Sequence, residues 1–297
     1  MEILATEKLT KKYKRLTALN QLDFTIQKGT VFGLLGPNGS GKTTTLGMIL
    51  NVIQPTSGSY RWFGKSPTPE SRRQIGAILE IPCFLPYLTA VQNLKIIAEI
   101  KHCSYQAIDK TLQTVGLYDR RDDPFKTYSL GMKQRLAIGA ALLSDPEVLI
   151  FDEPTNGLDP KGIVEIRELI IEIGQTGKTI ILASHLLDEV QKVCSDFMVL
   201  RKGEKLFQGS VEDALLSQKT IEVGSPDLDV LKNALERFSG IQELKTTADQ
   251  CILKTDSQVT TTQIGQFLLE QNIPINHLLK KEGSLEKEFL NILSEHE

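Results

Sequence analysis

The sequence lacks any long hydrophobic run. A membrane-spanning helix needs about 18 or more largely uninterrupted apolar residues. Even the apolar stretch at residues 168–184 is broken by Glu172, Lys178 and two glycines. The first 15 residues also lack the apolar core of a secretory signal peptide. The sequence therefore predicts a protein that stays in the cytosol.

Cysteine and excess charge are also scarce. The four cysteines, Cys83, Cys103, Cys194 and Cys251, lie far apart and form no CxxC pair. Isolated thiols of this kind favour buried or incidental cysteines over a disulfide framework or a zinc site. The formal net charge is −3, with acidic and basic residues well mixed. This balance disfavours nucleic acid as a partner, because nucleic-acid-binding proteins concentrate basic residues.

Strands and helices alternate through the first two thirds of the chain. A buried strand, "TVFGLLG" (30–36), runs into a glycine-rich turn and then a helical stretch at 41–53. Two further apolar strands, at 147–154 and 178–185, flank a helical pattern at 162–177. Such alternation predicts an α/β fold with a mostly parallel sheet covered by helices. Residues of about 85–145 are mostly helical in pattern and predict a helical subdomain.

The pattern changes after residue 217. The tail reads as strand, helix, two strands, helix and strand, which is the βαββαβ order of a ferredoxin-like α+β unit. A last amphipathic helix follows, with Ser284 as its expected N-cap. The sequence therefore predicts two domains, 1–217 and 218–297.

The segment "GPNGSGKT", Gly36–Thr43, matches the phosphate-binding pattern GxxxxGK[ST] between a strand and a helix. Glycines let backbone N–H groups turn towards a polyphosphate, and the helix N-terminus adds its positive dipole end. Lys42 is expected to reach the β and γ phosphates, and Thr43 to bind Mg²⁺. A chance glycine-rich turn would not need this flanking strand and helix. The predicted nucleotide-binding residues here are Gly36, Asn38, Gly39, Ser40, Gly41, Lys42, Thr43 and Thr44.

Two carboxylates end the strand in "VLIFDEP" (148–154). Asp152 is expected to bind Mg²⁺, and Glu153, at the tip of the strand, to hold and deprotonate an attacking water. An acidic turn without function would explain this heptapeptide alone, but the upstream phosphate-binding loop argues against that. The next strand ends in "LASH" and adds His185 as a second candidate catalytic residue.

The segment "YSLGMKQR" (128–135) begins a helix. Ser129 can cap that helix, and a helix start with small residues can bind an anion. Taken alone, the segment is equally well explained as a simple helix cap. Its position between the phosphate-binding loop and "LIFDEPTNGLDP" favours a functional role.

With these motifs, residues of about 2–217 resemble the ATP-binding cassette (ABC) family. In that resemblance Gly36–Thr43 are the Walker A loop, Asp152 and Glu153 the Walker B pair, and Asn156–Pro160 the D-loop. His185 corresponds to the switch histidine. Tyr13 lies where the family stacks an aromatic ring on adenine; the alternative is an ordinary tyrosine at the edge of a strand.

"YSLGM" resembles the family's LSGGQ signature. Ser129 and Gly131 match it, whereas Leu130 and Met132 depart from it, which puts affinity in doubt more than role. The resemblance implies a homodimer in which two copies pack head to tail around ATP and Mg²⁺. Ser129, Gly131 and Met132 of one copy would then face the γ-phosphate held by the other, and Asp159 would act across the interface. It also implies separate integral membrane permease subunits, which would hold the protein peripherally at the inner face of the cell membrane.

In "ILEIPCF" (78–84), Glu80 occupies the place of the family's Q-loop glutamine. A carboxylate keeps a side-chain oxygen and is a good ligand for a hard cation, so Glu80 is a candidate Mg²⁺ ligand. An exposed acid in a shifted loop is the alternative. The sequence alone does not determine whether the added charge raises or lowers nucleotide affinity.

Glu80, the signature and the tail segment "GSLEKEFL" (283–290) together resemble ATPase subunits of bacitracin export and lantibiotic immunity. The resemblance implies an ATP-hydrolysing subunit that drives export of an antimicrobial peptide. The alternative is a non-transport cassette protein that acts as a conformational module. A P-loop kinase would leave the signature and "DEPTNGLDP" unexplained.

Overall fold

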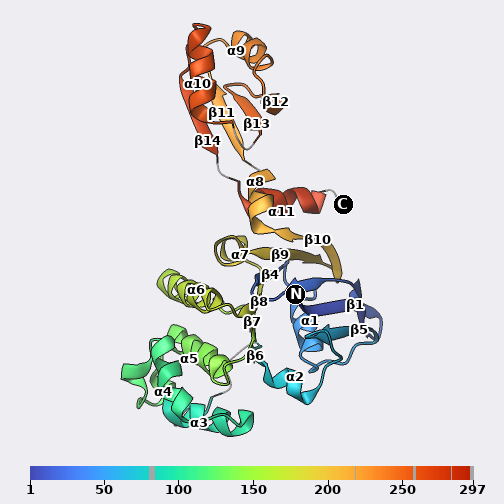
Figure 1. Cartoon of the computed structure of the whole chain (residues 1–297), viewed down its shortest axis with the longest axis vertical. Coiled ribbons are helices and arrows are strands. Elements are labelled where there is room, and N and C mark those ends of the chain that lie inside the picture. Colours follow the sequence, from blue (N-terminus) through green and yellow to red (C-terminus); the bar gives the residue numbers. More distant parts are fainter. Residues whose placement is uncertain (80–83, 218, 257–258, 282, 295–297) are drawn as a thin grey trace. The chain divides into compact units, whose positions relative to one another are not determined.

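The computed structural model describes every residue except 80–83, 218, 257–258, 282 and 295–297. The chain divides into two compact units, Met1–Gly209 and Ser210–Glu297 (Figure 1). Each unit has a buried hydrophobic core of its own. None of the helices in the described part of the chain has the length and apolar character that crossing a bilayer requires.

The first ten strands are β1 (Glu2–Tyr13), β2 (Leu16–Leu22), β3 (Thr25–Gln27), β4 (Val31–Leu35), β5 (Ser57–Trp62), β6 (Ile75–Ile78), β7 (Val148–Asp152), β8 (Thr179–Ser184), β9 (Asp196–Arg201) and β10 (Glu204–Ser210). The first seven α-helices are α1 (Lys42–Ile49), α2 (Pro69–Arg73), α3 (Ala90–Lys101), α4 (Gln106–Thr114), α5 (Leu130–Leu142), α6 (Pro160–Gln175) and α7 (Leu187–Val193). Two short 3-10 helices, Tyr118–Arg120 and Phe125–Thr127, precede α5.

Six strands form the main sheet in the order β10-β9-β4-β8-β7-β6. The strands from β9 to β6 run parallel to one another. The residues of β7 and β8 are all buried, as expected for central strands of a parallel sheet covered on both faces. This confirms the predicted α/β fold. Because the strands are parallel, their carboxyl ends all meet at one edge, where the loops to the following helices begin.

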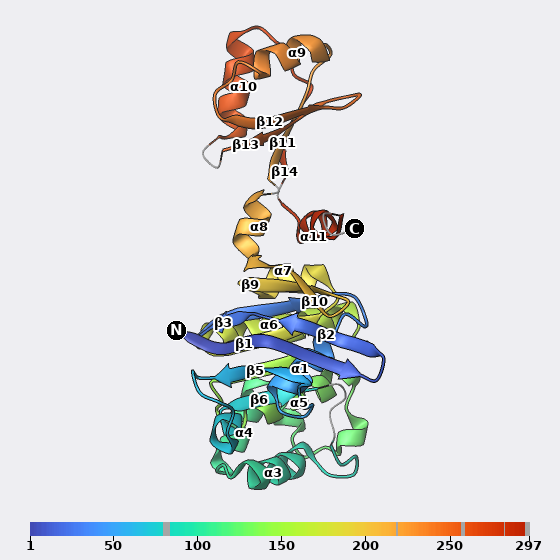
Figure 2. The same ribbon diagram turned by 90° about the vertical axis from the view of Figure 1, so that its right-hand side faces the viewer.

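A second, antiparallel sheet forms around β1, which pairs with β2, β3 and β5. The strands β2 and β5 were not expected from the sequence pattern. One buried cluster joins this sheet to α1 and β4, and Figure 2 shows α1 beside β1 and β5. Trp62 lies fully buried in that cluster, and its indole N–H donates to the carbonyl of Ile49 at 2.7 Å.

Helices α3, α4 and α5 group together next to β6 and form the predicted helical subdomain (Figure 1). Thr89 caps α3 with a capping box, in which its hydroxyl accepts from Gln92 N–H and the Gln92 side chain accepts from Thr89 N–H. Asn93 in the next turn is buried, and its amide hydrogen-bonds the chain near Leu85 and Leu88. The segment before α3 is thereby tied to the subdomain.

The C-terminal unit contains α8 (Val211–Ser217), β11 (Thr220–Gly224), α9 (Leu228–Leu235), β12 (Ile241–Thr246), β13 (Cys251–Thr255), α10 (Thr261–Glu270), β14 (His277–Lys281) and α11 (Leu285–Ser294). Its antiparallel sheet has the order β12-β13-β11-β14. The chain order βαββαβ and this strand order confirm the predicted ferredoxin-like arrangement. The sequence placed the boundary near residue 217, and the compact units meet between Gly209 and Ser210, because α8 packs against α11.

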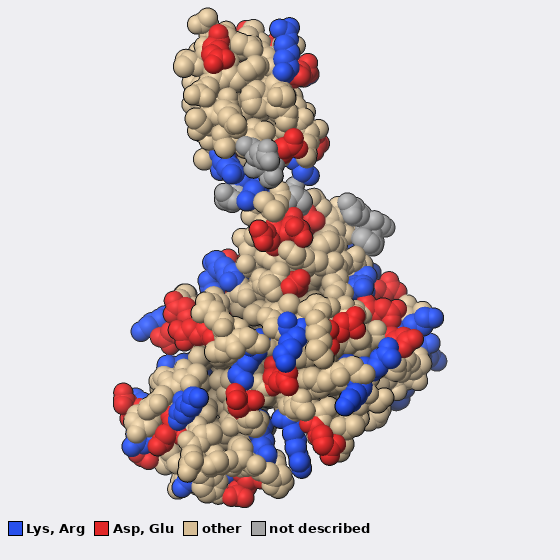
Figure 3. Space-filling view, in the orientation of Figure 1, with Lys and Arg blue, Asp and Glu red and all other residues tan. Residues whose placement is uncertain are grey.

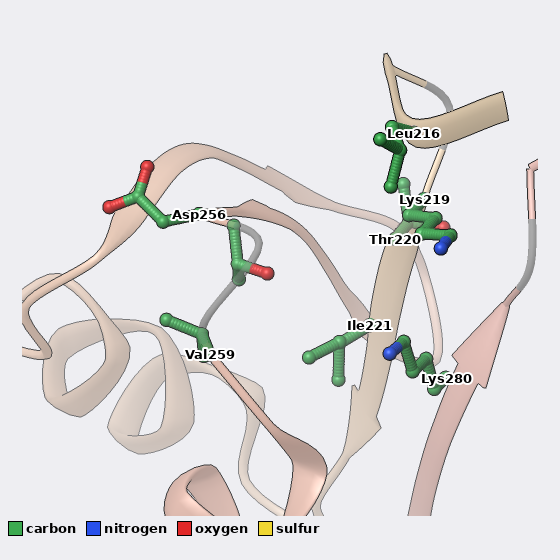
Figure 4. Close-up of a pocket in the computed structure, with 8 residues that line it drawn as sticks. Leu216, Lys219, Thr220, Ile221, Asp256, Val259 and Lys280 are labelled. Carbon is green, nitrogen blue, oxygen red and sulfur yellow. The ribbon is translucent and has the colours of Figure 1, made fainter. Parts of the chain in front are cut away.

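A small hollow of about 90 Å³ lies beside the start of β11 and the end of β14 (Figure 4). Ile221 and Val259 form its apolar wall, and Lys219 and Lys280 also line it. The carboxylate of Asp256 points away from the hollow and accepts a hydrogen bond from Gln242 at 2.6 Å.

Because each unit has its own core, we expect the two units to unfold independently. Leu253 is fully buried in the C-terminal core. Leu253→Ala should lower the free energy of unfolding of this unit by about 2–5 kcal/mol, through lost apolar burial and the cavity left behind. Trp62, the only tryptophan of the chain, reports the N-terminal unit by fluorescence, while circular dichroism follows both units.

The matched control is Leu269→Ala, at a leucine of α10 that is 75% exposed. We expect Leu253→Ala to leave the Trp62 transition in urea unchanged. A Trp62 transition that shifts with the Leu253→Ala transition would mean that the two units unfold as one.

Candidate nucleotide-binding site

The loop between β4 and α1 carries the predicted phosphate-binding segment. Gly39 and Gly41 have φ angles of +79° and +111°, which glycine adopts without strain. A Cβ at Gly36 would lie 2.3 Å from the carbonyl oxygen of Leu200 in β9. The backbone can therefore take this path only with glycine at these positions. Its N–H groups and the start of α1 form the kind of site that binds a polyphosphate.

Lys42 is the first residue of α1 and is only 6% exposed. Its Nζ donates to the carbonyl of Gly36 at 2.7 Å and lies 3.3 Å from Glu153 Oε1. The hydroxyl of Thr43 donates to Asp152 Oδ2 at 2.8 Å. The phosphate-binding loop and the two carboxylates that follow β7 are thus joined directly, although they lie about a hundred residues apart in the chain.

The strand order explains how a third motif joins them. β8 lies between β4 and β7, so its carboxyl end meets the same edge of the sheet. The backbone N–H of Glu153 donates to the carbonyl of Ala183 at 2.9 Å. Nδ1 of His185, just past the end of β8, lies 2.8 Å from Glu153 Oε2. Glu153 itself has φ +49°, an unusual backbone conformation for a residue other than glycine and a frequent one at functional sites.

A cavity of about 610 Å³ opens beside the phosphate-binding loop, a size suited to a small ligand. Residues from β1, β2 and the turn after β9 complete its lining. The lining residues are Tyr13, Leu16, Thr17, Ala18, Asn38, Gly39, Gly41, Lys42, Thr43, Thr44, Glu153 and Lys202. Tyr13, 43% exposed, has its ring 4.9 Å from Lys11 Nζ. Gly36 and Ser40 support the loop without lining the cavity.

The donor set fits a magnesium ion that arrives with its phosphates. Mg²⁺ is bound in such sites by one or two protein oxygens, substrate phosphates and water. Thr43 Oγ1 and Asp152 Oδ2 supply two hard oxygens side by side. Within the described residues, no cluster of three or more His, Cys, Asp or Glu side chains is placed to hold a metal ion by itself.

Comparison with known proteins identifies this arrangement. Residues 19–156 match the ABC transporter family. The bacitracin transport ATP-binding protein BcrA of Bacillus licheniformis is 36% identical over 298 residues, which cover 98% of this chain and 97% of that protein. This chain belongs to the ABC transporter ATP-binding family. It is the ATP-binding and ATP-hydrolysing subunit of an ABC transporter, rather than the non-transport module that the sequence left as an alternative.

Two further comparisons extend over different parts of the chain. The lantibiotic transport ATP-binding protein SrtF of Streptococcus pyogenes is 39% identical over 212 residues, 70% of this chain and 93% of that protein. The solved structure of cbiO1 from Clostridium perfringens, part of an ABC transporter complex, is 29% identical. It has a TM-score of 0.66 and covers 80% of this chain and 96% of its own. These relatives confirm the predicted cassette fold.

The predicted signature residues Ser129, Gly131 and Met132 lie at the start of α5. Ser129 caps α5, with its hydroxyl accepting from Met132 N–H at 3.3 Å. None of the signature residues lines the cavity beside the phosphate-binding loop. Ser129 is exposed, as is Leu130 beside it. Just before them, burial raises the pKa of Tyr128, whose hydroxyl donates to the carbonyl of Arg120 at 2.6 Å.

The D-loop begins beside the signature. A Cβ at Gly157 would lie 3.4 Å from a methyl group of Leu130, and a Cβ at Gly131 would lie 4.0 Å from Leu158. Asp159 is exposed and caps α6, with its carboxylate accepting from Gly162 N–H at 3.0 Å. The predicted D-loop is therefore held by contacts within its own chain, while Asp159 is exposed to solvent.

The prediction for Glu80 falls on a residue outside the described part of the chain. Lys202 was missed by motif reasoning. It lies in the turn between β9 and β10, and the next residue, Gly203, donates its N–H to the carbonyl of Ser40 at 2.9 Å. A signal was present in the glycine of "RKGE", which marks a tight turn, but only the fold brings that turn beside the phosphate-binding loop.

Glu153→Gln removes the carboxylate nearest to both Lys42 and His185 while keeping the size of the side chain. We expect it to lower ATP hydrolysis by roughly 100-fold or more, because an amide cannot accept a proton from water. ATP binding should be retained, since Lys42 and the loop backbone are unchanged. Phosphate release and binding of a fluorescent ATP analogue measure the two effects.

The matched control is Glu172→Gln, at an exposed position of α6. Hydrolysis by this control should equal that of the unchanged protein. Normal turnover by Glu153→Gln would rule out Glu153 as the residue that activates water.

Proposed function

We propose that this cassette powers the export of an antimicrobial peptide of the bacitracin or lantibiotic kind and so protects the cell that makes or meets it. The observation that carries the proposal is the extent of the match to BcrA of Bacillus licheniformis. That match spans 98% of this chain and therefore includes the C-terminal unit as well as the cassette. The match to SrtF, over 212 residues, supports the same class of cargo from the cassette.

The active form in this proposal is a head-to-tail homodimer. The γ-phosphate of a transferring nucleotide needs a cation or dipole supplied from outside the phosphate-binding loop, as an arginine finger does elsewhere. Ser129, which is exposed, and the half-buried Gly131 and Met132 lie at the start of α5 and outside the cavity of their own chain. A second copy that places its α5 start over this cavity would supply the missing group, with Asp159 at the same interface.

The residues around the cavity then take distinct roles. The loop from Gly36 to Thr43 binds the phosphates, and Tyr13, which lines the same cavity, contacts the base. Thr43 and Asp152 would hold Mg²⁺, which neutralises phosphate charge when bound. Glu153 orients and deprotonates the attacking water, and His185, 2.8 Å from it, contacts the γ-phosphate.

The proposed partners follow from the same family. Separate permease subunits would cross the membrane, and the cassette would lie at its cytoplasmic face. The nucleotide-binding unit would be Met1–Gly209, and the tail would be Ser210–Glu297. On the face shown in Figure 3, acidic and basic side chains are interspersed, which agrees with the expectation that nucleic acid is not a partner.

Resistance measures the cargo directly. In a host that lacks this cassette, the full chain expressed together with its permease should raise the minimum inhibitory concentration of bacitracin or of a lantibiotic several-fold. The same pair with Glu153→Gln in the cassette should not, because export needs turnover. An antibiotic that acts inside the cell, such as an aminoglycoside, serves as the control. Equal sensitivity of both strains to every peptide tested would contradict the proposed cargo.

Glu80 generates a separate prediction from the sequence. If it binds Mg²⁺ and couples the cassette to the permease, Glu80→Ala should reduce the resistance that the cassette and permease confer together, and Glu80→Gln should retain more of it, because the amide keeps a side-chain oxygen. Glu70→Ala, at an exposed position of α2, is the control. Full resistance with Glu80→Ala would remove Glu80 from the coupling path.

A further inference from the structure

A carboxylate lies buried in α7, the helix that follows the switch histidine. Glu189 belongs to α7, which begins two residues after His185, and is only 4% exposed. Carboxylates are seldom buried unless they are paired, since the charged form loses its hydration. Neither the nucleotide motifs nor the cavity lining includes this residue.

Two side chains from other segments meet Glu189. Arg167 Nη2 lies 3.6 Å from its Oε1, and the Thr155 side chain lowers the pKa of the same carboxylate. Both partners are largely buried, Thr155 at 3% and the Arg167 side chain at 16% exposed. Burial raises the pKa of Glu189, whereas Arg167 and Thr155 act in the opposite direction.

Thr155 and Arg167 both belong to the segment that follows β7. Thr155 lies two residues beyond Glu153, in the turn where its carbonyl accepts from Leu158 N–H at 3.2 Å. Arg167 lies in α6, the helix that Asp159 caps. The carboxylate of Glu189 therefore joins the segment that follows β8 to the turn and helix that follow β7.

We propose that Glu189 is a positioning residue for ATP hydrolysis. Its carboxylate holds the turn after Glu153 against the helix after His185, and so maintains the 2.8 Å contact between the Glu153 and His185 side chains. The inference rests on the proposed roles of Glu153 and His185. A displacement of about 1 Å at reacting groups is enough to slow catalysis by roughly 100-fold.

The helix that carries Glu189 is also seated by apolar contacts. A Cβ at Gly33 of β4 would lie 2.7 Å from Val190 Cγ1, so α7 packs closely on the central strand. Val190 is fully buried, and Val193 nearly so. The fold of α7 thus has support that a change at Glu189 leaves in place, which separates positioning from folding.

The test compares Glu189→Gln with Asp188→Asn in the full chain. Asp188 is the preceding residue of α7, has a side chain that is 63% exposed, and pairs with Lys192 at 2.8 Å. Glu189→Gln keeps an oxygen for Thr155 but loses the ion pair with Arg167. We expect kcat to fall by roughly 10-fold with the KM for ATP within about twofold, because the phosphate-binding loop is untouched. Asp188→Asn should match the unchanged protein.

Two further variants keep the test decisive if Glu189→Gln folds poorly. Thr155→Val removes the hydroxyl from the other side of the contact and should also lower kcat without raising KM. The double variant Glu189→Gln/Arg167→Gln replaces the ion pair with two neutral amides, so that no charge is left unpaired. It should recover part of the kcat lost in Glu189→Gln. Melting temperatures of all variants identify any loss of folded protein.

The inference is overturned if Glu189→Gln and Thr155→Val keep full kcat per folded molecule, or if their kcat falls only in proportion to the folded fraction. Glu153→Gln, measured in the same assay, separates this outcome from failure of the proposed function. An inactive Glu153→Gln beside a fully active Glu189→Gln removes only the positioning role. A fully active Glu153→Gln removes the proposed site.

Discussion

The adjacency of three parallel strands, β4, β8 and β7, is the constraint on which the rest of the site depends. Parallel strands bring their carboxyl ends to one edge, and each of these strands ends in a different chemical group. β4 leads into the loop of Lys42, β8 ends just before His185, and β7 ends in Asp152. The 2.8 Å contacts from Thr43 to Asp152 and from His185 to Glu153 follow directly from that order. A different strand order would leave the same motifs in the sequence and no site in the fold.

The charges of the site are balanced internally. Lys42 is held by the carbonyl of Gly36 and by Glu153, so a buried cation has partners in the folded chain. Helix α6 forms ion pairs with two neighbouring helices. Arg167 pairs with Glu189 of α7, and Glu165 lies 3.9 Å from Arg135 of α5. Asp159 caps α6. In the proposed dimer, these ion pairs would join the segments at the interface to those that line the nucleotide site.

Local patterns predicted the elements whose signals lie close together in the chain. Ser129 caps α5 as the sequence indicated, and the βαββαβ tail has the expected order. Patterns failed where a distant partner decides the structure. β2 and β5 are strands because β1 pairs with them, and α8 belongs to the C-terminal unit because α11 packs on it. Lys202 lines the cavity because the hydrogen bond from Gly203 N–H to the Ser40 carbonyl holds its turn beside the phosphate-binding loop.

The sequence by itself determined the chemical groups and the family. Glycines at positions that demand positive φ, a lysine and a threonine after them, and paired acids after an apolar strand supply the groups that a phosphate and magnesium site needs. Only the tertiary structure decided which groups meet. His185 contacts Glu153, Glu189 pairs with Arg167, and the predicted signature residues lie outside the cavity of their own chain. These pairings join residues far apart in the chain, and strand order and helix packing, which no local pattern encodes, set their distances.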